Sequence, residues 1–196
     1  MNPTPLRIIE AARSCLLADG YAALSTRRVA EVAGVPLSQI HYHFRGKQGV
    51  ILALLDHENR QLVARQREMY GSDTPLWRRY EQACDFLEDD LASGYVRVLQ
   101  EMIAAGWADT ELAARVLALL QSWFDVLGEV AREAEERFGS LGPIRPADLS
   151  MLIGLSFLGG EAVLLLGDAG WGDRVRSALR SAGAVIRRFE EPASDA

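Results

Sequence analysis

The chain has 196 residues, 49% of them apolar, and a net charge of −6. That length suits one large domain, or a small domain joined to a larger one, with enough apolar residues for a core. Only two cysteines occur, Cys15 and Cys84, far apart in sequence, which argues against a disulfide framework or a zinc cluster and favours a reducing cytoplasm.

The negative total conceals a basic N-terminal segment. Residues 1–60 contain seven Arg and Lys against five Asp and Glu, a net charge of +2, whereas the remaining residues contain 14 against 22, a net charge of −8. This asymmetry is expected when one end of a protein meets phosphate. A merely solvated surface is the alternative interpretation. The N-terminus also lacks the basic-then-apolar pattern of a secretory signal.

The first elements in chain order are short helices. Thr4-Pro5 is a cap followed by proline at the first helical position, and Asp19-Gly20 ends the helix that follows. Ser25 can cap a second helix, with Leu24 and Val29 placed as a hydrophobic staple. That helix ends at Ala33-Gly34, and a third runs from the Gly-Val-Pro turn to Phe44.

The rest of the chain also shows helical periodicity. A long helix begins near Lys47, and others are expected near 75–92, 94–106, 109–138, 146–167 and 172–190. The apolar run Met151 to Gly167 contains Glu161 and is shorter than a membrane span of about 20 residues, so we expect a buried helix and no membrane partner. The prediction is an all-α chain of about nine helices with a disordered tail at 192–196.

Two short helices joined by a glycine-containing turn predict a helix-turn-helix motif. Its buried contacts are expected from Ala30, Val32, Val35, Ile40 and Phe44. The second helix can then face the major groove of DNA with its outer residues, Leu37, Ser38, Gln39, His41, Tyr42 and His43.

The residue types in this motif suit DNA chemistry. Tyr42, the two histidines and Lys47 are phosphate-binding types, and Lys47 lies at a helix start, where the dipole favours an anion. Gln39 can present its amide to adenine, Leu37 can touch a thymine methyl, and Arg27 or Arg28 can reach guanine or phosphate.

The stretch STRRVAEVAGVPLSQIHYHFRGKQGVI resembles the DNA-binding region of the TetR family of transcriptional regulators. The matching residues are Thr26, Ala33-Gly34-Val35, Ile40, His43-Phe44 and Lys47. The resemblance implies a helix-turn-helix domain over 1–47 and a helical effector-binding and dimerisation domain over 48–191. Pro36 and His41 depart from the family pattern, where a capping Ser and a phosphate-contacting Tyr are usual.

Non-DNA roles for the histidines remain open. His41 and His43 are two apart on a helix and point to nearly opposite sides, so they cannot bind one metal ion from one face. We therefore expect no metal site and no cofactor. Packing of either histidine against a neighbouring helix is the alternative to DNA contact.

The two C-terminal helices are too apolar for a monomer surface, and the resemblance implies a homodimer in which they pair with their copies. Burial within one subunit is the alternative. The candidate interface residues are Met151, Leu155, Leu158, Gly159, Ala162, Leu165, Leu179 and Ile186.

The middle helices hold several large rings, which could line a ligand cavity or form ordinary core. The resemblance implies a small-molecule effector of unknown identity there. The candidate contacts are Glu101, Met102, Trp107, Trp123, Phe124 and Asp125.

The function predicted from these observations is a ligand-responsive regulator, most consistent with a repressor, that binds a pseudo-palindromic DNA operator as a homodimer. A DNA-binding protein without ligand gating is the alternative. A helical enzyme is a further one, but we expect no catalytic residues, because the sequence has no Gly-rich phosphate loop and no nucleophile–base pair at useful spacing.

Overall fold

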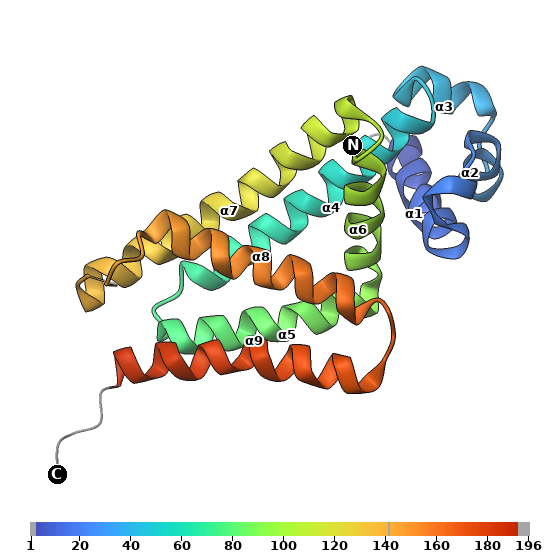
Figure 1. Ribbon diagram of the computed structural model, residues 1–196. Helices are drawn as coiled ribbons and strands as arrows, with labels where there is room; N and C mark the ends of the chain where they lie inside the picture. Colours follow the sequence, from blue (N-terminus) through green and yellow to red (C-terminus); the bar gives the residue numbers. More distant parts are fainter. Residues whose placement is uncertain (1–2, 141, 192–196) are drawn as a thin grey trace, which may run out of the picture. The chain divides into compact units, whose positions relative to one another are not determined.

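The computed structural model describes residues 3–140 and 142–191, and these form an all-α fold, as predicted (Figure 1). The expected disorder of 192–196 lies outside the described residues. The helices are α1 (Pro3–Ala23), α2 (Thr26–Ala33), α3 (Leu37–Phe44), α4 (Lys47–Tyr70), α5 (Leu76–Ser93), α6 (Tyr95–Gly106), α7 (Thr110–Phe138), α8 (Pro146–Leu164) and α9 (Ala169–Glu190).

The chain divides into two compact units. Unit 1 comprises Met1–Gln61 and Gly94–Leu120, and unit 2 comprises Leu62–Ser93 and Gln121–Ala196. Helices α4 and α7 each contribute residues to both. The domain boundary that we predict after residue 47 lies at the end of the helix-turn-helix motif, whereas these units are defined by contacts within the structure. That boundary stays a prediction.

Unit 1 is built around α1. This helix packs against α2 and α6, and α2 packs against α3. Ile8, Leu16, Ile40, Leu54 and Met102 are fully buried in one shared core. Each such side chain contributes about 1.5–3 kcal/mol of transfer free energy, so this core holds the short helices α2 and α3, which would not be stable alone.

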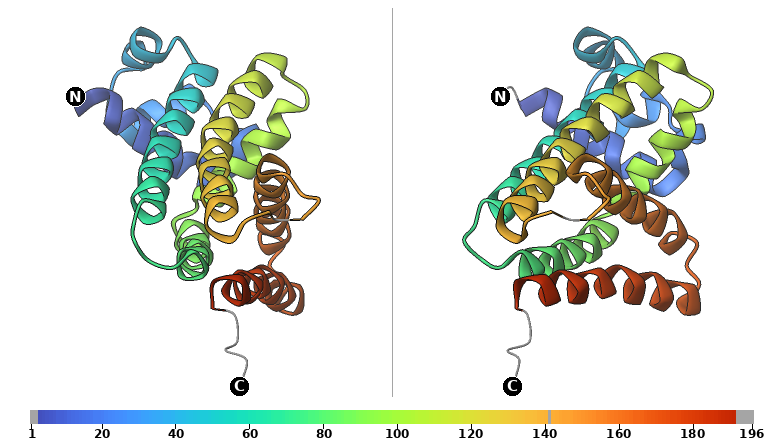
Figure 2. Two further views of the ribbon diagram at one scale, coloured as in Figure 1. Left: turned by 90° about the vertical axis from the view of Figure 1, so that its left-hand side faces the viewer. Right: turned by 60° about the vertical axis from the view of Figure 1, so that its left-hand side comes forward.

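Unit 2 is built around α9, which runs beside α5 and α8 (Figure 2). Buried Leu179 of α9 and Phe157 of α8 supply apolar contacts, and the Phe157 ring lies 6.0 Å from the Tyr80 ring of α5. Arg176 of α9 also pairs with Glu88 of α5 at 2.6 Å. This pair is partly exposed, so apolar packing carries most of the stability.

Several helix ends differ from the predicted ones. Helix α1 begins at Pro3, before the predicted Thr4 cap. Helix α8 ends at Leu164 rather than near 167, and α9 begins at Ala169 rather than 172. The reason for the early start of α9 is Asp168, whose carboxylate accepts a hydrogen bond from the Trp171 amide at 2.9 Å.

Two burial predictions were wrong. Val32 is 46% exposed, because the buried residues Val29, Ala30 and Ala33 occupy the other face of α2. Helix α8 is only partly buried, because Gly154, Phe157, Gly160 and Glu161 pack inside unit 2 while Met151, Leu152 and Leu155 are 45–57% exposed.

Helix α8 is also long and apolar enough to cross a membrane by length and composition alone, with a mean hydropathy of 1.5. Its buried face belongs to the folded unit, however, and that face includes the carboxylate-bearing Glu161. The packing against α9 therefore fits a core helix with one uncovered side.

Candidate nucleic-acid interface

Helix α2 is positioned by its own two ends. The Ser25 hydroxyl accepts a hydrogen bond from the Arg28 amide at 3.2 Å, which confirms the predicted cap. Leu24 and Val29, the predicted staple, are both buried. At the other end Gly34 adopts the left-handed conformation (φ 61°) and its amide bonds to the Ala30 and Glu31 carbonyls. The chain can then reverse sharply into α3.

Helix α3 is held by one side and leaves its other side open. Ile40 is fully buried in the unit 1 core, and Phe44 packs partly against it. Arg45 (φ 62°) ends the helix, as predicted for Arg45-Gly46. Pro36 occupies the cap position and α3 begins at Leu37 without a side-chain cap. The Gln39 amide donates to the Pro36 carbonyl at 2.9 Å.

The predicted DNA-contact residues fall into two groups by exposure. Arg27, Arg28, Ser38, His41 and Tyr42 are exposed, and Tyr42 is 80% exposed. The remaining five are half-buried, namely Thr26, Leu37, Gln39, His43 and Lys47.

Several of these side chains contact other groups of the protein. The guanidinium of Arg28 lies 3.5 Å from the Glu31 carboxylate, an exposed pair of little energetic weight. The His43 ring lies edge-on to the Tyr42 ring, with centroids 4.8 Å apart. This ring contact lies within α3, so packing of His43 against a neighbouring helix stays a prediction, whereas His41 faces solvent.

Lys47 makes an intramolecular contact that the sequence did not reveal. Its Nζ donates to the Tyr21 carbonyl at 2.7 Å and lies 4.3 Å from the centre of the Tyr21 ring. Partial burial lowers the pKa of this ammonium group. Lys47 thus ties the start of α4 to the end of α1, and any phosphate contact would use its remaining N–H donors.

Arg7 was also missed, although it supports the turn between α2 and α3. Its Nη2 donates to the carbonyls of Ala33, at 2.5 Å, and Gly34, at 3.2 Å. These carbonyls lie at the C-terminal end of α2, where a cation is favoured. No clear signal for this role is present in the sequence, because Arg7 and Arg13 are both basic residues of the same helix.

Helix α6 fixes the far end of α1 within unit 1. Glu101 accepts a hydrogen bond from the Tyr21 amide and pairs with Arg97 at 3.1 Å. Arg97 in turn donates to the Leu17 carbonyl at 2.9 Å. The backbone around Gly20, where α1 is interrupted, is therefore held by charged groups of α6.

The structure does not bring the six candidate effector residues together. Glu101 is engaged with α1, Met102 is fully buried in the unit 1 core, and Trp107 is 84% exposed. Trp123, Phe124 and Asp125 lie in unit 2, where the Trp123 and Phe124 rings are 5.2 Å apart. Asp125 accepts from Gln121 at 2.8 Å. An effector role for these six residues stays a prediction.

Unit 2 contains a cavity of about 430 Å³ whose described lining residues include none of those six. Helical periodicity could not distinguish its lining from ordinary core. One candidate interface residue, Ile186, belongs to the lining.

The other candidate interface residues lie mainly on the uncovered side of α8. Met151, Leu155, Gly159, Ala162 and Leu165 are exposed, Leu158 is half-buried, and Leu179 of α9 is buried. Within residues 3–140 and 142–191, no three His, Cys, Asp or Glu side chains are grouped so as to hold a metal ion.

Comparison with known proteins finds a family match for the N-terminal helices. Residues 8–54 match the model of the bacterial regulatory proteins of the tetR family. The HTH-type transcriptional regulator YvkB of Bacillus subtilis (strain 168) is 40% identical over 70 residues, which are 35% of this chain and 37% of YvkB. The chain thus matches little more than a third of this relative's length, and the name of the relative describes it as an uncharacterized transcriptional regulator.

Solved structures share the whole fold at low identity. The fatty acid degradation regulator FadR from Bacillus halodurans has a TM-score of 0.77 at 18% identity, covering 95% of both chains. FadR from Bacillus subtilis, solved in complex with stearoyl-CoA, has a TM-score of 0.73 at 16% identity, covering 92% of this chain and 96% of that one. The tetR-family match is therefore carried by residues 8–54, and the solved structures show a shared fold over most of the chain.

Proposed function

We propose that the protein is a ligand-responsive transcriptional regulator, most consistent with a repressor, that binds a pseudo-palindromic operator as a homodimer. The observation that carries the DNA-binding part is the geometry of α3. Buried Ile40 anchors this helix while Ser38, His41 and Tyr42 face solvent, which is the presentation that a recognition helix needs in the major groove.

The basic residues around α3 support the same proposal. Arg27 and Arg28 are exposed in the first turn of α2, where the helix dipole also favours phosphate. Such contacts set the position of the protein on DNA, whereas base edges are read by groups such as the amide of Gln39.

The homodimer is supported by the uncovered side of α8. Its exposed Met151, Leu155, Gly159 and Ala162 recur at helical spacing and form one apolar strip, and such a strip marks an association surface. A second copy of the chain is the partner we propose, because one recognition helix reads few bases. A twofold dimer reads two half-sites about 34 Å apart, or a multiple of that distance.

Effector gating is supported by the connections of α1. Lys47 of α4 and Arg97 and Glu101 of α6 all hold the end of α1. An effector that binds one arrangement of these helices better than another would change operator affinity by the ratio of those affinities. The stearoyl-CoA complex of FadR shows that a protein of this fold can hold a small molecule.

Selection of random duplex DNA by the purified full-length protein tests the proposal. We expect a palindromic site to be recovered. Arg27→Ala should weaken binding to all sequences and reduce the slope of log K against log salt concentration by about one. Gln39→Ala should instead relax the base preference at particular positions of the site. Arg132→Ala, which removes an exposed charge from α7, is the matched control.

Recovery of no preferred sequence would contradict the proposal. A recovered site whose affinity no small molecule changes would instead favour the alternative, a DNA-binding protein without ligand gating. Thermal stabilisation by candidate ligands separates these two possibilities without DNA.

A further inference from the structure

We propose that the cavity in unit 2 binds an uncharged, mostly apolar small molecule. As the site of the effector, this inference rests on the proposed function, but binding itself can be tested without DNA. The cavity volume of about 430 Å³ falls within the range of small-molecule sites, about 300–1,000 Å³.

The cavity has a buried floor and an apolar mouth. Leu76, Tyr80 and Leu127 are at most 7% exposed, whereas Val185 and Phe189 are 56% and 62% exposed. The lining comes from α4, α5, α7, α8, α9 and the segment before α8, through Tyr70, Leu76, Tyr80, Leu127, Val130, Ala131, Ala134, Phe138, Ile144, Leu149, Ile153, Ala182, Val185, Ile186 and Phe189.

The phenols of Tyr70 and Tyr80 are the polar side-chain groups among these described lining residues. Burial raises the pKa of both phenols far above the usual value, so both remain neutral and can donate a hydrogen bond at physiological pH. A hydroxyl, carbonyl or ether oxygen on an otherwise apolar ligand would match them.

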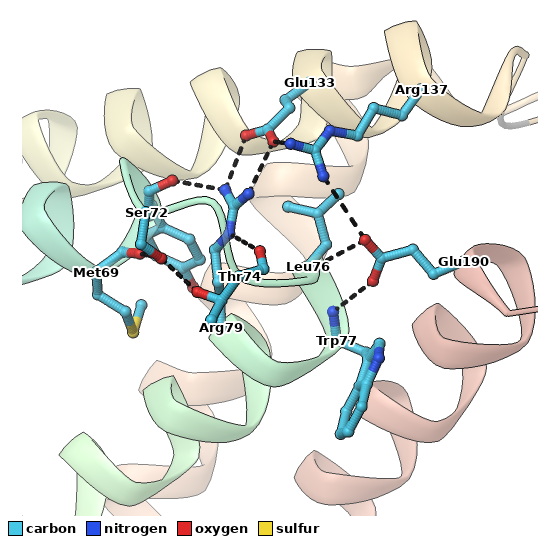
Figure 3. Close-up of polar contacts among 10 residues, drawn as sticks. Met69, Ser72, Thr74, Leu76, Trp77, Arg79, Glu133, Arg137 and Glu190 are labelled. Carbon is cyan, nitrogen blue, oxygen red and sulfur yellow. Dashed lines mark hydrogen bonds and ion pairs between the residues drawn. The ribbon is translucent and has the colours of Figure 1, made fainter.

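Arg79 lies beside this lining but is already paired. The side chain is 1% exposed, and Nη1 and Nη2 bind the two Glu133 carboxylate oxygens at 3.0 Å each. Nε also donates to the Thr74 carbonyl and Nη1 to the Tyr70 carbonyl, both at 2.6 Å (Figure 3). The guanidinium is therefore engaged and poorly placed to neutralise an anionic ligand.

The neighbouring charges continue this network. Arg137 lies 2.7 Å from Glu133 and 3.7 Å from Glu190, and Glu190 accepts from the amides of Leu76 and Trp77 at 2.9 Å each (Figure 3). A charged ligand would lose its hydration in the cavity while the charges nearby already have partners. A neutral ligand avoids that cost.

Binding of a matched pair of fluorescent probes tests the ligand class. N-phenyl-1-naphthylamine is neutral, and 8-anilino-1-naphthalenesulfonate has the same rings with one negative charge. We expect the wild-type full-length protein to bind the neutral probe at least tenfold more tightly. Decanol should likewise displace it at concentrations at least tenfold below those needed for decanoate or decyltrimethylammonium.

Filling the cavity tests the location. Ala134→Trp on α7 and Ala182→Phe on α9 add bulk to separate walls, and each should weaken binding of the neutral probe at least tenfold. Ala118→Trp, at an exposed position of α7 outside the lining, is the matched control and should leave affinity unchanged. Thermal melting of each variant shows whether it remains folded. Because the two substitutions are on different helices, the test still works if one of the two variants fails to fold.

Equal binding of neutral and charged probes would overturn the ligand class. Unchanged affinity in both folded wall variants would overturn the site, since the probe would then be bound elsewhere, for example on exposed α8. Operator affinity can be measured in the same samples. If it stays constant while decanol occupies the cavity, effector gating is contradicted even though the binding site itself is confirmed.

Discussion

At the scale of single residues, the helix-turn-helix depends on side chains and backbone angles that carry no obvious DNA chemistry. Gly34 takes a left-handed conformation, and Arg7 holds the carbonyls around it. Lys47, which the motif predicts as a phosphate contact, also ties α4 to the Tyr21 backbone. The predicted phosphate contact of Lys47 would therefore link DNA affinity to stability at that residue.

Gly34→Ala should lower the free energy of unfolding by about 1–2 kcal/mol, because a Cβ is disfavoured at φ 61° and would lie 3.2 Å from the Arg7 guanidinium. Urea denaturation followed by circular dichroism measures this change. Gly128→Ala is the control, since that helical glycine has open space around it and alanine should be neutral or stabilising. Equal effects at both positions would refute the assigned role of Gly34.

Lys47→Ala should lower the free energy of unfolding by about 1.5–3 kcal/mol. The reason is that the Tyr21 carbonyl loses a charged hydrogen-bond donor and the Tyr21 ring loses its cation. The unfolding midpoint in the absence of DNA reports this effect alone. The salt dependence of operator binding by the same variant then reports whether Lys47 also meets phosphate. An unchanged midpoint would show that the contact with Tyr21 is energetically unimportant.

At the scale of elements, helix types and order could be predicted from the sequence because apolar spacing and caps such as Ser25 are local signals. Local signals could not decide which side of α8 is covered, nor that Val32 faces solvent, since both depend on packing partners distant in sequence. The cavity in unit 2 was missed for the same reason: Tyr80 and Ile186 have the spacing of ordinary core residues.

The apolar strip on α8 gives a prediction at this scale. Leu155→Glu places a charge in the middle of the strip, and desolvating that charge at an interface should dissociate the dimer at micromolar concentration. Sedimentation velocity measures the state of association. Leu117→Glu on α7, at a residue that is 65% exposed in unit 1, should leave it unchanged. If Leu155→Glu and Leu117→Glu gave the same distribution of sedimentation coefficients, α8 would not be the interface.

At the scale of the whole molecule, each compact unit contains one buried, free cysteine: Cys15 in unit 1 and Cys84 in unit 2. Burial raises the pKa of both thiols, that of Cys84 to about 11 from 9.0. The thiolate fraction of Cys84 at pH 8 is then about 100-fold below that of an ordinary thiol. The two thiols are natural reporters of opening in their own units.

Native protein at pH 8 should react with a disulfide reagent such as DTNB far more slowly than a free thiol does, because reaction needs both exposure and deprotonation. Single Cys→Ala variants assign each rate to one unit, and the rate for Cys84 should rise with pH up to about 11. Immediate labelling of both thiols without denaturant would contradict the burial of these side chains.

The carboxylate of Glu190 has a practical consequence for anyone shortening this protein. It lies in the last turn of α9, yet it supplies the acceptors for two amides at the beginning of α5. A truncation that ends at residue 189 would remove the hydrogen-bond acceptor of those two amides, although they lie more than a hundred residues earlier in the chain. Trimmed versions made for crystallisation should therefore stop no earlier than Glu191, whose own carboxylate accepts from the Trp77 indole.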